Sequence, residues 1–166
     1  TLNIDNPRLD CRLKGYENFS PKRIILDKNL EIKLNSYIYK SAKKNNTIIF
    51  YASNNKTKIK ILKKKYMKLI KYKLNNYGHF NLKQIFKKLY LLGIRNLLVE
   101  GGDKITHNLL KNRLFNQFYL FKSSKNISKN EKHLAFTSSD ILNNIFNAKK
   151  KFSTKLAKDN ITIYKR

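Results

Sequence analysis

The 166-residue chain contains few residues of several kinds, and each scarcity excludes a class of protein. A single cysteine, Cys11, excludes an internal disulfide framework and any zinc site built from several cysteines. No apolar run approaches the length of about 18 residues that a membrane helix needs, so the sequence predicts no transmembrane helix. No signal-peptide pattern is visible, but the chain opens at Thr1 without an initiator methionine, and we expect it to be part of a longer protein.

Acidic side chains are also scarce, with 10 Asp and Glu against 37 Lys and Arg and a net charge of +27. Such a charge is typical of nucleic-acid binders. However, only 6 of the basic residues are arginine, the side chain that nucleic-acid recognition favours. Lys, Asn and Ile, which have A- and T-rich codons, supply 71 of the 166 residues. The charge therefore favours a biased genome over a specific nucleic-acid role.

The composition is that of one folded domain spanning residues 1–166. Hydrophobic residues make up 41% of the chain and aromatic residues 12%, which excludes a disordered polyelectrolyte. A chain of this length buries enough surface to fold without disulfides or metals. Because the composition has drifted so far toward Lys and Asn, the ten remaining carboxylates are reasonable places to look for chemistry.

Hydrophobic patterning predicts alternating strands and helices through residue 122, and therefore an α/β domain with a mixed sheet. Residues 1–21 and 123–133 lack a regular pattern. The helix that Asn81 opens should bury Leu82, Ile85, Phe86, Leu89 and Tyr90 and end at Gly93. The expected strands are 22–26, 47–52, 68–74, 95–99 and 116–122. The other expected helices are 56–66, 103–112 and a short one at 140–146. The expected terminal hairpin pairs 149–157 with 160–165.

Two segments carry the residues that indicate chemistry. Leu97 to Gly102 reads LLVEGG and precedes a helix. Paired glycines let the backbone approach a ligand closely, and a helix N-terminus offers unpaired N–H groups, so this turn is a candidate phosphate-binding site. Alone, such a Gly-Gly turn is more often structural. The other segment is Thr1 to Arg12, TLNIDNPRLDCR.

Together these segments resemble the reductase domain of the bacterial bifunctional riboflavin-biosynthesis deaminase/reductase, the RibD family. That family has T-x-x-x-D-[DN]-P-x-L-x-x-R, then P-x-R-[IV]-[IV]-[LI]-D, and later V-E-G-G. Here these motifs are Thr1 to Arg12, Pro21 to Asp27, and Val99 to Gly102. The order, the spacing and the helix before VEGG all match over residues 1–122.

The resemblance implies a dihydrofolate-reductase-like α/β fold with a mixed, mostly parallel sheet flanked by helices and a C-terminal antiparallel hairpin. It implies a cytoplasmic, NADPH-dependent oxidoreductase that reduces the ribose of 5-amino-6-(5-phosphoribosylamino)uracil to the ribityl form in riboflavin biosynthesis. It also suggests a homodimer. A zinc deaminase domain would precede Thr1, and the reductase's first strand and its helix would lie upstream as well.

By the same resemblance, Leu9, Arg12 and Glu100 bind the substrate. Arginine can grip a phosphate bidentately, and Glu100 would hold sugar hydroxyls. The cofactor would contact ten residues: Thr1, Asp5, Lys28, Gly102, Asp103, Lys104, Ile105, Thr106, His107 and Asn108. A plain helical role for His107 is about as good an interpretation. No metal ligands are predicted.

Two points stay open at this level. The catalytic proton donor is unassigned, because Glu100 qualifies only if burial raises its pKa. Phe121 to Asn126 departs from the apolar-Pro-Lys-Leu-Gly-Gly loop of the family, which places that wall of the site in doubt. The alternatives are a related reductase acting on another pyrimidine or pteridine-type substrate, and a lysine-rich nucleic-acid-binding module.

Overall fold

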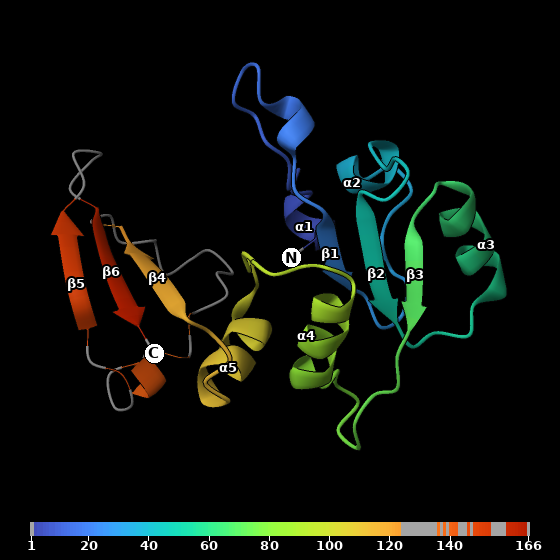
Figure 1. Cartoon of the computed structure of the whole chain (residues 1–166). Coiled ribbons are helices and arrows are strands. Elements are labelled where there is room, and N and C mark those ends of the chain that lie inside the picture. Colours follow the sequence, from blue (N-terminus) through green and yellow to red (C-terminus); the bar gives the residue numbers. More distant parts are fainter. Residues whose placement is uncertain are drawn as a thin grey trace, which may run out of the picture. The chain divides into compact units, whose positions relative to one another are not determined.

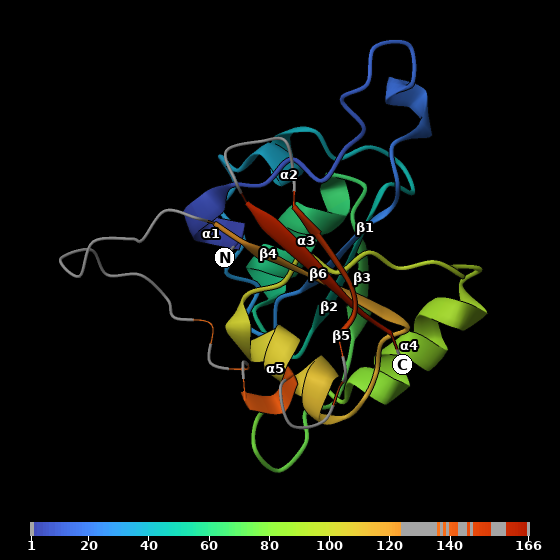
Figure 2. The same ribbon diagram turned by 90° about the vertical axis from the view of Figure 1, so that its left-hand side faces the viewer.

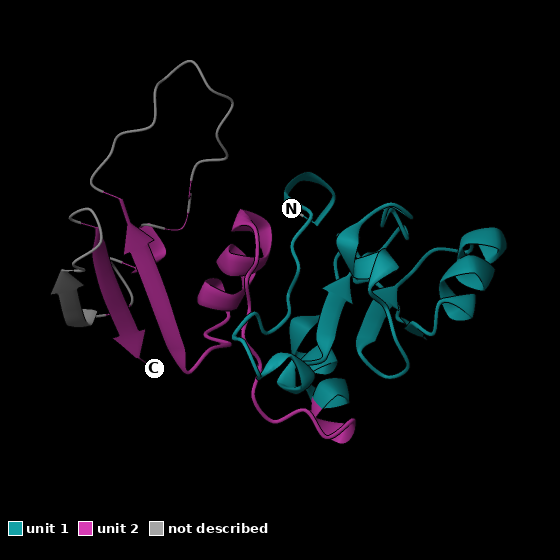
Figure 3. Ribbon diagram, turned by 90° about the horizontal axis from the view of Figure 1, so that it is seen from above, with its two compact units in different colours: residues 1–89 teal, residues 90–166 magenta. Residues whose placement is uncertain are grey.

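The computed structural model describes residues 2–123, 136, 138, 140–142, 146, 148–153 and 159–165 (Figure 1, with a second view in Figure 2). It contains two compact units, unit 1 with residues 1–89 and unit 2 with residues 90–166 (Figure 3). Each unit has its own sheet and its own cluster of buried apolar side chains.

Unit 1 is built on a three-stranded parallel sheet in the order β1-β2-β3 (Figure 1). The strands are β1 Arg23–Leu26, β2 Thr47–Tyr51 and β3 Lys68–Lys71. β-Branched and aromatic residues suit a pleated, covered surface, and every residue of the central strand β2 is buried. Because the strands are parallel, their carboxyl ends lie at the same edge of the sheet.

Short helices connect and cover these strands. They are α1 Leu2–Asp5, the 3-10 turn Glu17–Phe19, α2 Tyr37–Lys40, α3 Lys56–Lys64 and α4 Leu82–Leu91. Ser36 and Asn55 begin α2 and α3 in the expected way, because each side-chain oxygen accepts a hydrogen bond from the backbone N–H three residues later. No helix among the described residues is longer than the ten residues of α4, and none is suited to crossing a membrane.

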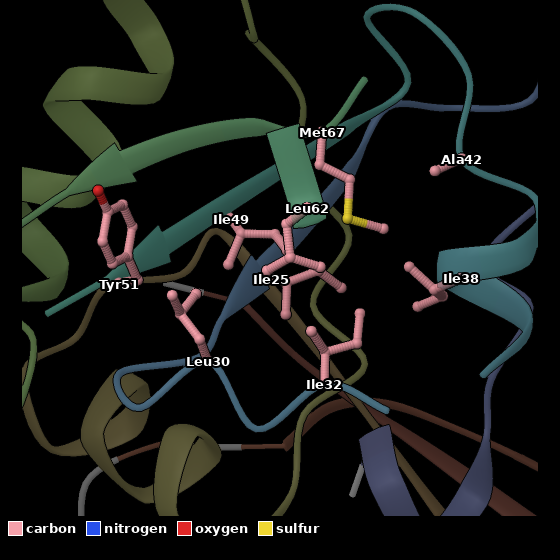
Figure 4. Close-up of a cluster of buried hydrophobic side chains, with 9 residues drawn as sticks. All are labelled: Ile25, Leu30, Ile32, Ile38, Ala42, Ile49, Tyr51, Leu62 and Met67. Atoms are coloured by element: carbon pink, nitrogen blue, oxygen red, sulfur yellow. The ribbon is translucent and has the colours of Figure 1, made fainter. Parts of the chain in front are cut away.

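The core of unit 1 is a cluster of nine buried side chains from β1, β2, α2, α3 and the segments between them. Figure 4 shows these side chains pointing toward one another. Burial of one large aliphatic side chain stabilises a fold by about 1.5–3 kcal/mol, so this cluster fixes the elements that carry the site residues of unit 1. Its members are Ile25, Leu30, Ile32, Ile38, Ala42, Ile49, Tyr51, Leu62 and Met67.

Unit 2 contains α5 Asp103–Lys111 and a three-stranded antiparallel sheet in the order β4-β6-β5. Its strands are β4 Gln117–Lys122, β5 Ala148–Ser153 and β6 Asn160–Lys165. Phe118 of β4 is paired with Tyr164 of β6, and both rings belong to the buried cluster around Leu110. β5 and β6 pair antiparallel, so the C-terminal hairpin expected from the sequence is confirmed.

The α/β class, with a parallel sheet, helices and a C-terminal antiparallel hairpin, is confirmed as well, and the parallel and antiparallel pairs lie in separate sheets. Residues 1–21 are less irregular than expected, because α1 and a 3-10 turn form within them. Of the helix expected at 140–146, residues 140–142 are helical and residues 143–145 lie outside the described residues, as does the expected loop at 123–133 beyond Ser123.

The strand expected at 95–99 is wrong. Residues 94–102 form neither strand nor helix, and Leu97, Leu98 and Val99 are 40%, 82% and 38% exposed. A strand needs a hydrogen-bonded neighbour to satisfy its backbone, and no described strand pairs with this segment. Tyr90 was also placed wrongly on the buried face of α4, since its ring is 59% exposed beneath the guanidinium of Arg95.

Candidate functional site

The N-terminal motif is fixed to the segment that follows β1. The Asn3 side chain donates to the carbonyl of Glu31 at 2.9 Å and accepts from the N–H of Lys33 at 3.3 Å. The Asn6 side chain accepts from the N–H of Tyr37 at 2.8 Å. These bonds join segments about thirty positions apart in the sequence, so α1 and Asp5 lie beside the chain that leaves the parallel sheet.

Lys28 lies at the carboxyl edge of that sheet. Its carbonyl accepts from the N–H of Ala52, the residue after β2, at 2.9 Å. Asp27 fixes the turn, because its two carboxylate oxygens accept from the N–H groups of Glu31 and Ile32 at 2.9 and 2.8 Å. The Lys28 side chain is exposed. Ligands of open α/β sheets bind outside the carboxyl ends of the strands, so Lys28 is in a suitable place for an anionic ligand.

Leu9 and Arg12 occupy different surroundings. Leu9 is half-buried against the core of unit 1 and has a left-handed backbone with φ +51°. Arg12 is exposed. The guanidinium of Arg12 is therefore available to an anion, whereas much of the Leu9 side chain is already used for packing.

Two residues of this motif, Arg8 and Asp10, form a polar cluster with Tyr37. The Tyr37 hydroxyl donates to Asp10 Oδ2 at 2.7 Å, and Arg8 Nε and Nη2 each approach the same oxygen at 3.3 Å. The Arg8 guanidinium lies 4.8 Å from the centre of the Tyr37 ring. The hydrogen bond from Tyr37 and the charges of Arg8 and Arg12 hold the pKa of Asp10 below its usual value, so this carboxylate is ionised at neutral pH.

This cluster was not predicted from the sequence. Asp10 is one of the ten scarce carboxylates, and this scarcity was the sequence feature that could have drawn attention to it. Nothing in the sequence indicates that it contacts Tyr37. Tyr37 begins the four-residue helix α2, which the patterning did not predict.

A buried arginine lies in β1 of the same unit. Arg23 is 5% exposed and donates to Thr47 Oγ1 at 3.1 Å, to Ser41 Oγ at 2.7 Å and to the Ser41 carbonyl at 3.2 Å. Burial lowers the pKa of Arg23, and the electrostatic influence of Tyr37 and Asp10 opposes this. No described carboxylate lies within ion-pair distance of it. Arg23 therefore joins β1 to β2 and to the end of α2.

In unit 2, Gly102 is the N-cap of α5 and has extended backbone angles of φ −76° and ψ 174°. Having no side chain, it leaves the approach to the first turn of α5 uncovered by a capping group. Of the predicted cofactor residues in α5, Lys104 is exposed and Asp103, Ile105, Thr106, His107 and Asn108 are half-buried. The His107 ring nitrogen Nδ1 lies 3.3 Å from the hydroxyl of the buried Ser138.

Glycine is needed at position 101 for packing within unit 2. A Cβ atom at this position would lie 2.0 Å from Cγ2 of Ile105, so the first turn of α5 packs where a side chain would be. Glu100 is exposed. The burial that would make its carboxyl a proton donor is therefore not observed.

The predicted site residues fall in both units. Unit 1 holds Asp5, Leu9, Arg12 and Lys28, and Thr1 lies outside the described residues. Unit 2 holds Glu100 and the stretch from Gly102 to Asn108 around the start of α5. Most of the segment after Phe121 that departs from the family pattern lies outside the described residues.

Residues 1–162 match the family model described as the RibD C-terminal domain. The chain is 34% identical over 125 residues to the riboflavin biosynthesis protein RibD of Aquifex aeolicus (strain VF5), covering 75% of this chain and 33% of that protein. The chain thus spans about a third of the length of this curated relative.

Solved structures show a shared fold. Acinetobacter baumannii RibD, form 2, superposes with a TM-score of 0.73 at 15% identity, covering 99% of this chain and 44% of that one. A pyrimidine reductase-like protein from Corynebacterium diphtheriae superposes with a TM-score of 0.66 at 17% identity, covering 88% of this chain and 61% of that one.

Proposed function

Because the chain belongs to the RibD C-terminal domain family, we propose that it is an NADPH-dependent reductase of riboflavin biosynthesis. Its substrate would be 5-amino-6-(5-phosphoribosylamino)uracil, whose ribose is reduced to the ribityl form. The observation that carries the proposal is the N-terminal motif: hydrogen bonds hold it against the segment after β1, and its last residue, Arg12, is exposed.

On the cofactor side, the residues of each unit suit an anionic dinucleotide. Lys28 offers an exposed ammonium at the carboxyl edge of the parallel sheet, which favours NADPH over NADH because the additional phosphate adds charge. Gly102 leaves the start of α5 uncovered, and the N–H groups there favour a diphosphate. When bound, NADPH supplies the hydride, and the protein supplies binding and orientation.

On the substrate side, the Arg12 guanidinium would bind the phosphate bidentately and Glu100 would accept hydrogen bonds from sugar hydroxyls. Holding the sugar carbon in line with the hydride donor is the main contribution that such residues make to the rate. The proton donor stays unassigned, because the exposed Glu100 lacks the burial that the role requires.

The proposal is tested by steady-state kinetics and NADPH titration on the full-length protein. Arg12→Ala should weaken binding of the phosphorylated substrate by about 1.5–3 kcal/mol, the range for hydrogen bonds to charged groups, and should cost much less with a dephosphorylated analogue. Glu100→Gln should reduce turnover of both compounds alike. Neither variant should change the NADPH dissociation constant by more than about twofold.

Lys14→Ala is the matched control, because Lys14 is an exposed cation two positions beyond Arg12 and outside the motif. It should leave all three quantities unchanged. A wild-type protein that does not reduce the substrate with NADPH would refute the proposed function. An Arg12→Ala variant that binds NADPH poorly but the substrate normally would mean that Arg12 is assigned to the wrong side of the site.

The homodimer, the cytoplasmic location and the upstream deaminase domain belong to the same proposal and rest on the family alone. Size-exclusion chromatography with light scattering of the full-length protein tests the first of them, with a mass of two chains as the expected result.

A further inference from the structure

Tyr37 holds the loop from Asn6 to Asp10 at both of its ends. At the first end, its backbone N–H donates to Asn6 Oδ1 at 2.8 Å. At the other, its hydroxyl donates to Asp10 Oδ2 at 2.7 Å. Leu9 lies between these two points, and Arg12 follows two residues after the second one.

This loop needs such support, because two of its residues have left-handed backbones without being glycine. The φ angles are +44° for Asn6 and +51° for Leu9. An L-residue adopts this region only at a cost, and a leucine has no polar side chain to offset it. Without contacts from elsewhere in unit 1, the loop would populate other conformations.

Tyr37 is itself firmly placed. Its carbonyl accepts from the hydroxyl of Ser41 at 2.6 Å and from the Ser41 N–H at 2.9 Å. Ser36, which precedes Tyr37 and is the N-cap of α2, is buried and donates to the Lys33 carbonyl at 2.6 Å. Ile38, which follows Tyr37, is fully buried in the core. The contacts of Tyr37 with the loop therefore originate from a fixed part of unit 1.

Arg8 completes the arrangement from within the loop. Its guanidinium donates to Asp10 Oδ2 and, at 3.2 Å, to the Tyr37 hydroxyl, while lying over the ring of the same tyrosine. Positions 8 and 10 are variable in the motif that identifies the family, and position 37 is outside it. The contacts among Arg8, Asp10 and Tyr37 are therefore a feature of this chain and are not part of the motif.

We propose that Tyr37 is a positioning residue for the substrate side of the site: it fixes the Asn6–Asp10 loop so that Leu9 and Arg12 meet the phosphorylated substrate in one arrangement. This inference rests on the proposed function for the identity of the ligand. The contribution comes from the hydroxyl, because the backbone N–H and the ring serve their contacts in phenylalanine as well.

Tyr37→Phe isolates that contribution without changing any charge. If the binding-competent fraction of the loop falls to about one fifth, the apparent affinity for substrate falls about fivefold. We therefore expect KM for the phosphorylated substrate to rise about three- to tenfold, with kcat and the NADPH dissociation constant within about twofold of wild type. Tyr39→Phe, on the same helix, is the control, because the Tyr39 hydroxyl bonds to no other described residue.

Cys11 supplies a readout that does not depend on activity. It is the only cysteine of the chain, it is half-buried, and it follows Asp10 directly. If the Tyr37 hydroxyl orders this loop, Tyr37→Phe should raise the rate of Cys11 alkylation by iodoacetamide about three- to tenfold, while Tyr39→Phe leaves it unchanged. An equal rate in the two variants would overturn the inference.

A double variant tests whether Tyr37 acts through Arg12. In an Arg12→Ala background, the charged one of the two positioned side chains is gone and only Leu9 remains, so Tyr37→Phe should raise KM by less than about twofold. A full three- to tenfold effect in that background would mean that Tyr37 does not act through Arg12, and would refute the positioning of that residue. If the wild-type protein does not turn over the substrate, the proposed function and the substrate half of this inference fail together, and the Cys11 rate still decides whether Tyr37 orders the loop.

Discussion

The two glycines before α5 allow packing and ligand approach to be tested separately. At Gly101 a Cβ atom would lie 2.0 Å from Cγ2 of Ile105, so an alanine requires that side chain or the first helical turn to move. Gly102 has φ −76° and ψ 174°, angles that any residue adopts. Gly101→Ala should therefore perturb the fold of unit 2, whereas Gly102→Ala should perturb the approach of the cofactor.

The expected magnitudes follow from these contacts. Forcing extra volume beside Ile105 costs about 1–3 kcal/mol in a packed region, and we expect the lower half of that range because Ile105 is only half-buried. For Gly102→Ala, two small effects oppose each other. Alanine is a poorer N-cap than glycine, which destabilises the fold, but it reduces the conformational entropy of the unfolded chain, which stabilises it. The free energy of unfolding should therefore change by less than about 0.5 kcal/mol. A methyl group at the diphosphate should weaken NADPH binding at least tenfold, or about 1.4 kcal/mol.

The assay combines urea unfolding followed by circular dichroism with NADPH titration followed by cofactor fluorescence. Gly15→Ala is the matched control. Gly15 has φ +85° and no atom within 4 Å of an added Cβ, so the variant should lose stability without losing NADPH affinity. Gly102→Ala with wild-type NADPH affinity would refute the assignment of this turn to the diphosphate. Gly101→Ala with wild-type stability would refute the packing argument for Ile105.

Two further predictions concern the charged groups of unit 1. The pKa of Asp10 is lower in the folded protein than the unfolded value of about 3.9, so its contribution to stability is present above that value and is lost as the pH falls through the folded pKa. On acidification below about pH 4, the free energy of unfolding of Asp10→Asn should therefore fall by less than that of the wild-type protein, and equal falls would contradict this. Arg23→Lys should destabilise by about 2–3 kcal/mol in urea unfolding, because one ammonium cannot replace three directed bonds to Thr47 and Ser41. Arg23→Met, which removes the buried charge, should cost less, and the reverse order would show that the charge itself is stabilising.

Local patterning was sufficient for most elements of this protein. The helix α4 has apolar residues at the spacing of one helical face, and Leu82, Ile85 and Leu89 are buried as that spacing predicts. The strands β1 and β2 are dense in β-branched and aromatic residues and flanked by turn signals. In these cases the side chains of one segment determine both its conformation and the face that it buries.

The pattern was insufficient where a segment depends on a neighbour that its own residues do not specify. Residues 95–99 contain three apolar residues, as β1 does, yet among the described residues they remain exposed and unpaired. A strand is completed only by the hydrogen bonds of a neighbouring strand. The apolar content predicted burial and could not predict the partner.

The candidate site divides in the same way. The sequence by itself determined which residues belong to the motifs, since order and spacing along the chain are sequence properties. Only the tertiary structure decided that Tyr37 lies against Asp10 and Asn6, that Arg23 is buried, and that Leu9 is used for packing. These hydrogen bonds join residues 18 to 31 positions apart. They form because β1, β2 and α2 are packed around one core, which brings distant side chains within hydrogen-bonding distance.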